Sequence, residues 1–112
     1  MTVTVDDAGS GDLLFGVVIG AFRDETREFR YDVIDVKFFQ SGRFYRKEYL
    51  RQSTRIVSEL LSRLRLGSDE MIRVCRGYIF DDAVEGLRRT YGDDRVRRVK
   101  VEGEAQRLTE LA

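Results

Sequence analysis

The chain contains no histidine, no tryptophan, no asparagine and a single cysteine. Without histidine, imidazole acid–base catalysis, Ser-His-Asp triads and histidine-ligated zinc are all excluded. The lone thiol, Cys75, cannot form an internal disulfide or a multi-thiolate metal site, which agrees with a reducing, cytoplasmic setting. Because Cys75 lies in an apolar run, we expect it to be a small core residue.

Signals for membranes and export are missing as well. No stretch approaches the roughly 20 apolar residues of a membrane-spanning helix. The N-terminus lacks the basic start and apolar core of a signal peptide. We therefore expect a cytoplasmic protein without membrane contact. Charged residues make up 36% of the chain and amides are few, a composition typical of thermophilic proteins.

The residues that are present predict one globular domain. The chain has 112 residues, of which 42% are hydrophobic, enough for a single core. Its 20 basic and 20 acidic side chains balance to a net charge of zero. Zero net charge gives no global attraction to nucleic acid, so any such binding must come from a local patch.

Hydrophobic patterning predicts five strands. The first covers residues 2–5 and runs into Asp6-Asp7, and the second is an apolar strand over residues 13–22, where Gly16 and Gly20 mark close approaches of other elements. Residues 29–38 alternate, but the apolar phase flips after Val33, which is typical of a β-bulge or of burial on both faces. The last two strands are expected at residues 71–75 and 95–101.

Three helices are expected. Apolar residues recur at helical spacing across residues 45–66, and Gly67 lies where a left-handed residue commonly ends a helix. A second helix spans residues 79–91 and stops at Gly92. Alternatively, the strand before it extends to Phe80 and Asp81 caps a shorter helix. Residues 105–111 form a short terminal helix.

The resulting order is βββαβαβα. Short turns make the first three strands antiparallel, and the strand–helix–strand unit at residues 71–101 requires a right-handed crossover between parallel strands. The predicted fold class is therefore α/β (mixed α+β), with a five-stranded mixed sheet and helices on its faces.

The opening residues and the element order together resemble the ribonuclease H-like superfamily over roughly residues 3–111. The similar segments are Val3-Thr4-Val5-Asp6-Asp7-Ala8-Gly9, matching a first strand with a metal-binding Asp, and Gly16-Val17-Val18-Ile19, matching a glycine-led second strand. Size and composition suggest similarity to a small archaeal branch. The resemblance implies a nuclease acting on RNA or structured DNA, with Mg²⁺ or Mn²⁺ held by three or four carboxylates.

The resemblance also implies which carboxylates would act. The candidate catalytic residues are Asp6, Asp7, Glu48, Asp81, Asp82, Glu102 and Glu104, and the candidate metal ligands are Asp6, Asp7, Glu48, Asp81 and Glu102. Strand alternation places Asp7 on the side of Val3 and Val5, and Asp6 on the opposite side. Either fits the first ligand, and Asp7 better matches the family's Asp followed by small residues.

The later carboxylates have plain structural alternatives. Glu48 falls about 145° from the centre of the apolar helix face, as a solvated residue near a helix N-terminus would. Asp81 fits the family only if its strand extends to Phe80, and otherwise Asp81 and Asp82 are surface charges of a helix. Glu102 and Glu104 suit the start of the terminal helix equally well.

Partners are suggested by two groups of residues. The candidate nucleic-acid-binding arginines are Arg88, Arg89, Arg95, Arg97 and Arg98, with Tyr91 available for base stacking. Surface ion pairing is the alternative, because Asp93-Asp94 lies among them. The alternative function is a non-catalytic binding or assembly module, in which Phe38-Phe39 and Phe44-Tyr45 meet a second copy or another protein, unless they are core residues under the long helix.

Overall fold

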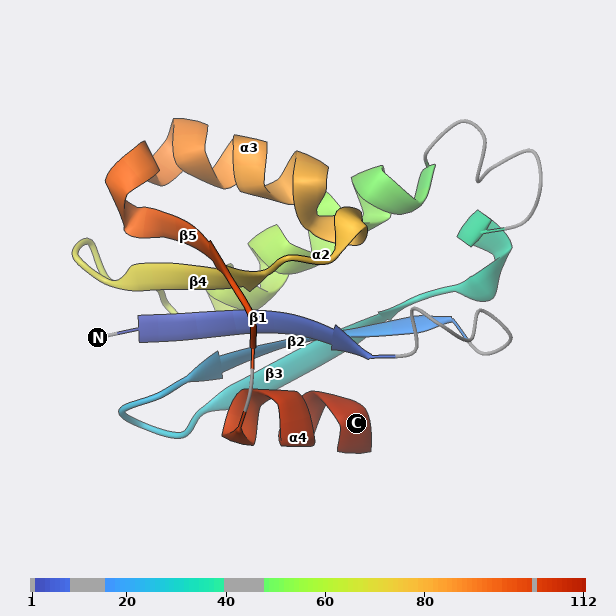
Figure 1. Ribbon diagram of the computed structural model, residues 1–112, viewed down its shortest axis with the longest axis horizontal. Helices are drawn as coiled ribbons and strands as arrows, with labels where there is room; N and C mark the ends of the chain where they lie inside the picture. Colours follow the sequence, from blue (N-terminus) through green and yellow to red (C-terminus); the bar gives the residue numbers. More distant parts are fainter. Residues whose placement is uncertain (1, 9–15, 40–47, 102) are drawn as a thin grey trace.

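A computed structural model gives the fold of residues 2–8, 16–39, 48–101 and 103–112 (Figure 1). Within these residues, strands and α-helices follow in the predicted order. The strands are β1 (Thr2–Ala8), β2 (Val17–Arg23), β3 (Phe29–Ile34), β4 (Met71–Cys75) and β5 (Val96–Val99). The helices are α2 (Glu48–Arg63), α3 (Asp81–Tyr91) and α4 (Glu104–Leu111), with 3₁₀ turns at Val36–Phe39 (η1), Tyr78–Phe80 (η2) and Asp93–Arg95 (η3).

The strands form one mixed sheet in the order β3-β2-β1-β4-β5. β1, β2 and β3 pair antiparallel, and β4 pairs parallel with β5, as predicted from the connections. The central strand β1 also pairs parallel with β4. The carboxyl ends of β1 and β4 therefore meet at the same edge of the sheet.

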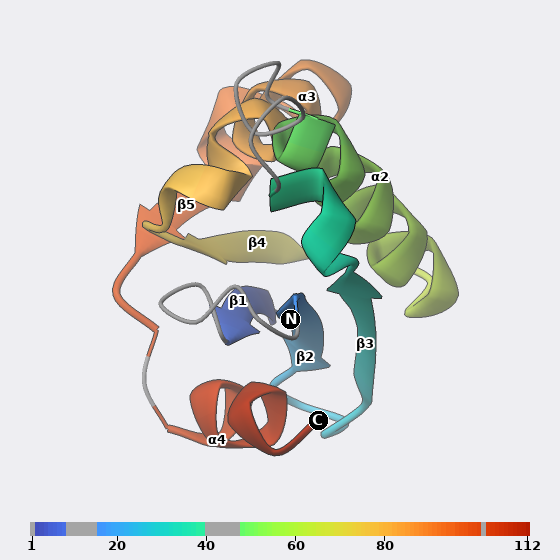
Figure 2. The same ribbon diagram turned by 90° about the vertical axis from the view of Figure 1, so that its right-hand side faces the viewer.

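Helices cover both faces of this sheet. α2 and α3 lie together on one face and α4 lies on the other, as the two perpendicular views show (Figures 1 and 2). The larger core fills the α2/α3 side and includes Val3 and Val5 of β1. A smaller cluster of Phe22, Val101 and Ala105 lies on the α4 side. Within the described residues, no helix is long and apolar enough to cross a membrane.

Several boundaries differ from the sequence prediction. β3 ends at Ile34 and the chain enters η1, so the phase flip marks the end of a strand rather than a bulge. β4 ends at Cys75, as the first alternative predicts, and the strand extended to Phe80 is wrong; η2 precedes α3, which starts at Asp81 rather than at residue 79. β5 covers only Val96–Val99. Residues 13–15 and 45–47 of the predicted elements lie outside the described residues.

The end of α2 also departs from expectation. The left-handed residue is Arg65, with φ 55°, and not Gly67. The backbone N–H of Leu66 reaches back to the carbonyl of Leu61 at 3.3 Å, as in a helix-ending turn. A side chain in this conformation is strained relative to glycine.

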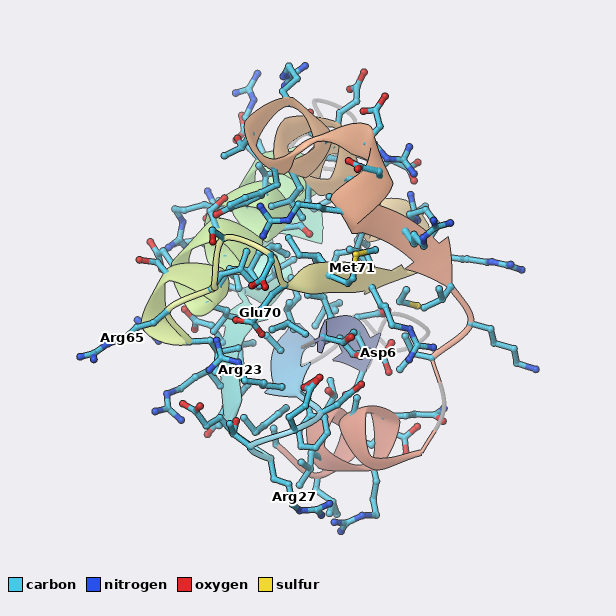
Figure 3. The ribbon with its side chains drawn as sticks, turned by 90° about the vertical axis from the view of Figure 1, so that its left-hand side faces the viewer. Asp6, Arg23, Arg27, Arg65, Glu70 and Met71 are labelled. Atoms are coloured by element: carbon cyan, nitrogen blue, oxygen red, sulfur yellow. The ribbon has the colours of Figure 1, made fainter. Side chains whose placement is uncertain are left out.

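A buried ion pair ties the loop after α2 to the sheet. The Arg23 guanidinium donates through Nε and Nη2 to the two oxygens of Glu70, at 3.0 and 2.8 Å, and through Nη2 to the carbonyl of Leu64 at 2.6 Å. Arg95 donates to the carbonyls of Glu70 at 3.0 Å and Gly67 at 2.7 Å. Figure 3 shows Arg23 and Glu70 facing each other at this corner of the molecule.

Candidate functional site

Asp6 and Asp7 are adjacent residues near the carboxyl end of β1, where strand alternation directs their Cβ atoms to opposite faces of the sheet. Asp6 is paired with Gly20 of β2, on the α4 side, and Asp7 is paired with Ile19, on the side of α2 and α3. The predicted alternation is therefore confirmed. Asp6 is buried, with 5% of its surface exposed, and Asp7 is half-buried.

The end of β4 brings a third side chain to the pair. Ligand atoms of Asp6, Asp7 and Cys75 all lie within 4.8 Å of one another. They open into a pocket of about 450 Å³, whose lining also includes Arg76 and Lys100. Gly77 leaves room for Asp7, because a Cβ there would lie only 3.3 Å from its Oδ1. The site therefore combines two carboxylates with nearby cationic side chains.

Burial dominates the electrostatics of Asp6. Desolvation raises the pKa of its carboxyl, and repulsion from Asp7 and from Glu110 of α4 raises it further. The backbone N–H of Asp7 and the thiol of Cys75 oppose this pKa increase by hydrogen bonding to the carboxylate. A cation between the two carboxylates would relieve the same repulsion.

Cys75 packs against both core clusters, as its apolar neighbours suggest, but it is only partly buried and also lines the pocket. Burial raises the pKa of its thiol to about 11, and the carboxylates of Asp6 and Asp7 add to the increase. The thiol is therefore protonated at neutral pH and is a weak ligand and nucleophile in that form. The oxygen atoms of Asp6 and Asp7 are the available donors, and oxygen donors suit Mg²⁺ or Mn²⁺.

Of the other predicted carboxylates, the three whose side chains are described do not join this cluster. Glu48 accepts from Arg51 at 3.0 Å, Asp82 from Thr54 at 2.7 Å, and Asp81 from Arg98 at 3.2 Å. In the part of the chain that the structure describes, Asp6, Asp7 and Cys75 are the one group of three such ligands. Glu102 and the side chain of Glu104 lie outside the described residues.

Three of the five predicted nucleic-acid-binding arginines donate hydrogen bonds to backbone carbonyls within the fold. Arg98 donates to the carbonyls of Cys75 at 3.1 Å and Gly77 at 2.8 Å, and Arg88 to the carbonyl of Val96 at 3.4 Å. Arg95 binds the loop after α2 and lies over the ring of Tyr91 at 5.2 Å. The remaining two, Arg89 and Arg97, are exposed.

Sequence reasoning missed five polar or charged contributors to the site. Cys75, Arg76, Lys100 and Gln106 line the pocket, and the charge of Glu110 acts on Asp6. The parallel pairing of β1 with β4 would have identified Cys75. The four-residue spacing of Gln106 and Glu110 places them on one face of α4.

Comparison with known protein families, curated proteins and solved structures finds no match for this chain. The geometry of the site is therefore what supports a function.

We expect Asp6→Asn to stabilise the protein at pH 7. Folding raises the pKa of Asp6, so the folded state favours the protonated carboxyl. The resulting contribution to stability is fully present below the unfolded pKa near 3.8 and is lost as pH rises through the folded pKa. Asparagine keeps an acceptor oxygen but carries no charge. In urea titrations at several pH values, the variant should gain more than about 0.5 kcal/mol at pH 7 and converge on wild type at acid pH. A variant that is less stable at pH 7 would show that the carboxylate charge is favourable.

Proposed function

We propose that this protein is a metal-dependent phosphodiester hydrolase of the ribonuclease H-like type, acting on RNA or structured DNA. The observation that carries the proposal is the placement of Asp6 and Asp7. Their oxygens lie within 4.8 Å of each other in an open pocket at the end of the central strand. A mixed sheet in the order β3-β2-β1-β4-β5 with helices on both faces supports the resemblance.

The residues present fit one divalent cation. Asp6 and Asp7 would supply oxygen ligands, and the desolvation and repulsion that raise the pKa of Asp6 are the conditions that a bound cation offsets. Such an ion activates water and stabilises the leaving oxygen of a phosphodiester.

The cationic residues of the same pocket have a complementary role. Arg76 and Lys100 line the pocket beside the carboxylates. Their charges would hold a substrate phosphate next to Asp6 and Asp7. Gly77 and the carbonyl contacts of Arg98 fix the backbone at the end of β4. The pocket thus offers separate positions for a cation and for an anionic substrate.

Cleavage assays with Mg²⁺ or Mn²⁺ test this function. Labelled single-stranded RNA, an RNA–DNA hybrid and branched DNA should be compared for wild type and for Asp6→Asn/Asp7→Asn. We expect metal-dependent cleavage of at least one substrate, falling to the buffer level in the double variant. Glu59→Gln is the matched control, because this partly exposed carboxylate of α2 pairs with Arg55 outside the pocket and should keep activity. Equal cleavage by the double variant would contradict the proposal.

A non-catalytic binding module is the second candidate function. It is favoured by the engagement of Glu48, Asp81 and Asp82 with other side chains and by the use of three predicted arginines in the fold. Phe38, predicted for a partner surface, packs against the main core, whereas residues 44–45 lie outside the described residues. Tyr31 and Val33 on the edge strand β3 are exposed and would be the contact surface for a second copy or another protein. Metal-independent self-association with no cleavage would favour this function.

A further inference from the structure

A second pocket, at the C-terminal end of α2, has a lining rich in arginine. It has a volume of about 580 Å³. Its charged residues are Arg23, Glu28, Arg30, Arg63, Arg65 and Glu70. They come from β2, the β2–β3 turn, β3, α2 and the segment that follows α2. Arg23 pairs with Val3 near the start of β1, whereas Asp6 and Asp7 lie near its carboxyl end, and the two pockets share no lining residue, so the role of this pocket is independent of the proposed hydrolase site.

The pocket carries a surplus of positive charge. Both of its carboxylates are paired with Arg23, Glu28 at 2.8 Å through Nη1 and Glu70 at 2.8 Å through Nη2. Four arginines against two glutamates leave a net charge of +2. In the described part of the chain, no carboxylate forms an ion pair with Arg30, Arg63 or Arg65. The surplus charge therefore belongs to these three exposed residues.

Arg65 adds an independent observation. It adopts the left-handed conformation, with φ 55°, which glycine occupies with less strain. Figure 3 shows its side chain extending outward from the molecule. The end of a helix ordinarily repels anions through its free carbonyls. Here Arg23 donates to the carbonyls of Leu64 at 2.6 Å and Arg65 at 3.2 Å, which reduces that repulsion.

We propose that this pocket binds a polyphosphate group, whether of a nucleotide or of inorganic polyphosphate. Guanidinium groups pair with phosphate through two parallel hydrogen bonds. Arg30, Arg63 and Arg65 lie on different segments, so together they match several linked phosphates better than one. A volume of about 580 Å³ is within the range of small-molecule sites.

Calorimetric titration with tripolyphosphate and a nucleoside triphosphate, in buffer of low ionic strength, tests the proposal. We expect saturable binding that weakens at least fivefold in Arg63→Gln and in Arg65→Gly. Arg65→Gly should also raise the melting temperature, because glycine relieves the left-handed strain, so lost binding cannot come from unfolding. Arg55→Gln is the matched control, since this exposed arginine of α2 pairs with Glu59 outside the pocket.

Each outcome of the titration distinguishes a ligand. Equal affinity for the two probes would assign binding to the phosphate chain, and tighter binding of the nucleoside triphosphate would assign a contribution to the nucleoside. Three results would overturn the proposal: no saturable binding, equal weakening by Arg55→Gln, or a hexaglutamate peptide binding as tightly as tripolyphosphate. None of these results depends on metal binding at Asp6 and Asp7.

Discussion

Replacing Arg23 by methionine is expected to destabilise the protein by about 3–5 kcal/mol, the usual result of removing one partner from a buried ion pair. The Glu70 side chain is 4% exposed, and its carboxylate receives two of its hydrogen bonds from Arg23. Among the hydrogen bonds of the described residues, the Glu70 carboxylate would keep only the one from the backbone N–H of Gly67, at 2.7 Å. Urea denaturation measures the loss.

The pH dependence of this loss follows from Glu70. The Arg23 guanidinium lowers the pKa of Glu70 below its usual value, so the stabilisation is present at neutral pH and disappears as pH falls through the folded pKa. The difference between wild type and Arg23→Met should therefore shrink at acid pH. A difference that stays constant with pH would show that packing of the Arg23 side chain, and not its charge, is responsible.

Two further variants isolate the pair. Glu28, the other partner of Arg23, has a side chain that is 40% exposed. Glu28→Gln should therefore lower the free energy of unfolding by less than about 1 kcal/mol. Arg23→Met/Glu70→Met removes both buried charges and should recover at least half of the loss, because no unpaired carboxylate remains. A double variant as unstable as Arg23→Met would contradict the ion-pair explanation.

Gly20→Ala is expected to destabilise the protein by about 1–3 kcal/mol, the usual cost of overpacking a core. A Cβ at this position would collide with Oγ1 of Thr109 on α4 and would lie 2.7 Å from the ring of Phe29. Gly20 is thus the reason that α4 approaches the sheet closely beside Asp6. Urea denaturation gives the free energy, and protease cleavage within α4 reports whether that helix detaches.

The control for Gly20 is another glycine. A Cβ on Gly86 of α3 would meet no atom within 4 Å, so Gly86→Ala should stabilise the protein by about 0.5–1 kcal/mol through helix propensity. Thr109→Ala added to Gly20→Ala removes one of the two collisions and should restore part of the loss. A neutral Gly20→Ala would show that α4 shifts without cost.

Much of the fold was predictable because local patterns dictate it. Residues 71–75 were predicted as a strand and form β4, and the close approach inferred at Gly20 is confirmed. The helix end was misplaced because Gly67 is the usual left-handed residue, whereas the chain uses Arg65. The backbone carbonyls of Arg65 and Leu64 accept hydrogen bonds from Arg23. This contact joins segments that are distant in the sequence, so no local pattern predicts it.

Of the candidate site, only the part on β1, with Asp6 and Asp7, was predictable from the sequence. Alternation along β1 correctly separated the faces of Asp6 and Asp7. The role of Cys75 depends on the parallel pairing of β4 with β1, and the predicted roles of Arg95 and Arg98 overlooked backbone carbonyls that become their partners only in the folded chain. Long-range contacts, and not residue type, decide which polar side chains remain available.

The most direct test of the metal site is an NMR titration of the isotope-labelled protein with Mn²⁺, whose unpaired electrons broaden nearby signals. We expect saturable broadening of amide signals near Asp6, Asp7, Cys75 and Gly77, competition by Mg²⁺, and loss of both effects in Asp6→Asn/Asp7→Asn. Broadening that is centred elsewhere, or that persists unchanged in the double variant, would contradict a cation site at the end of β1 and leave the binding-module function as the better explanation.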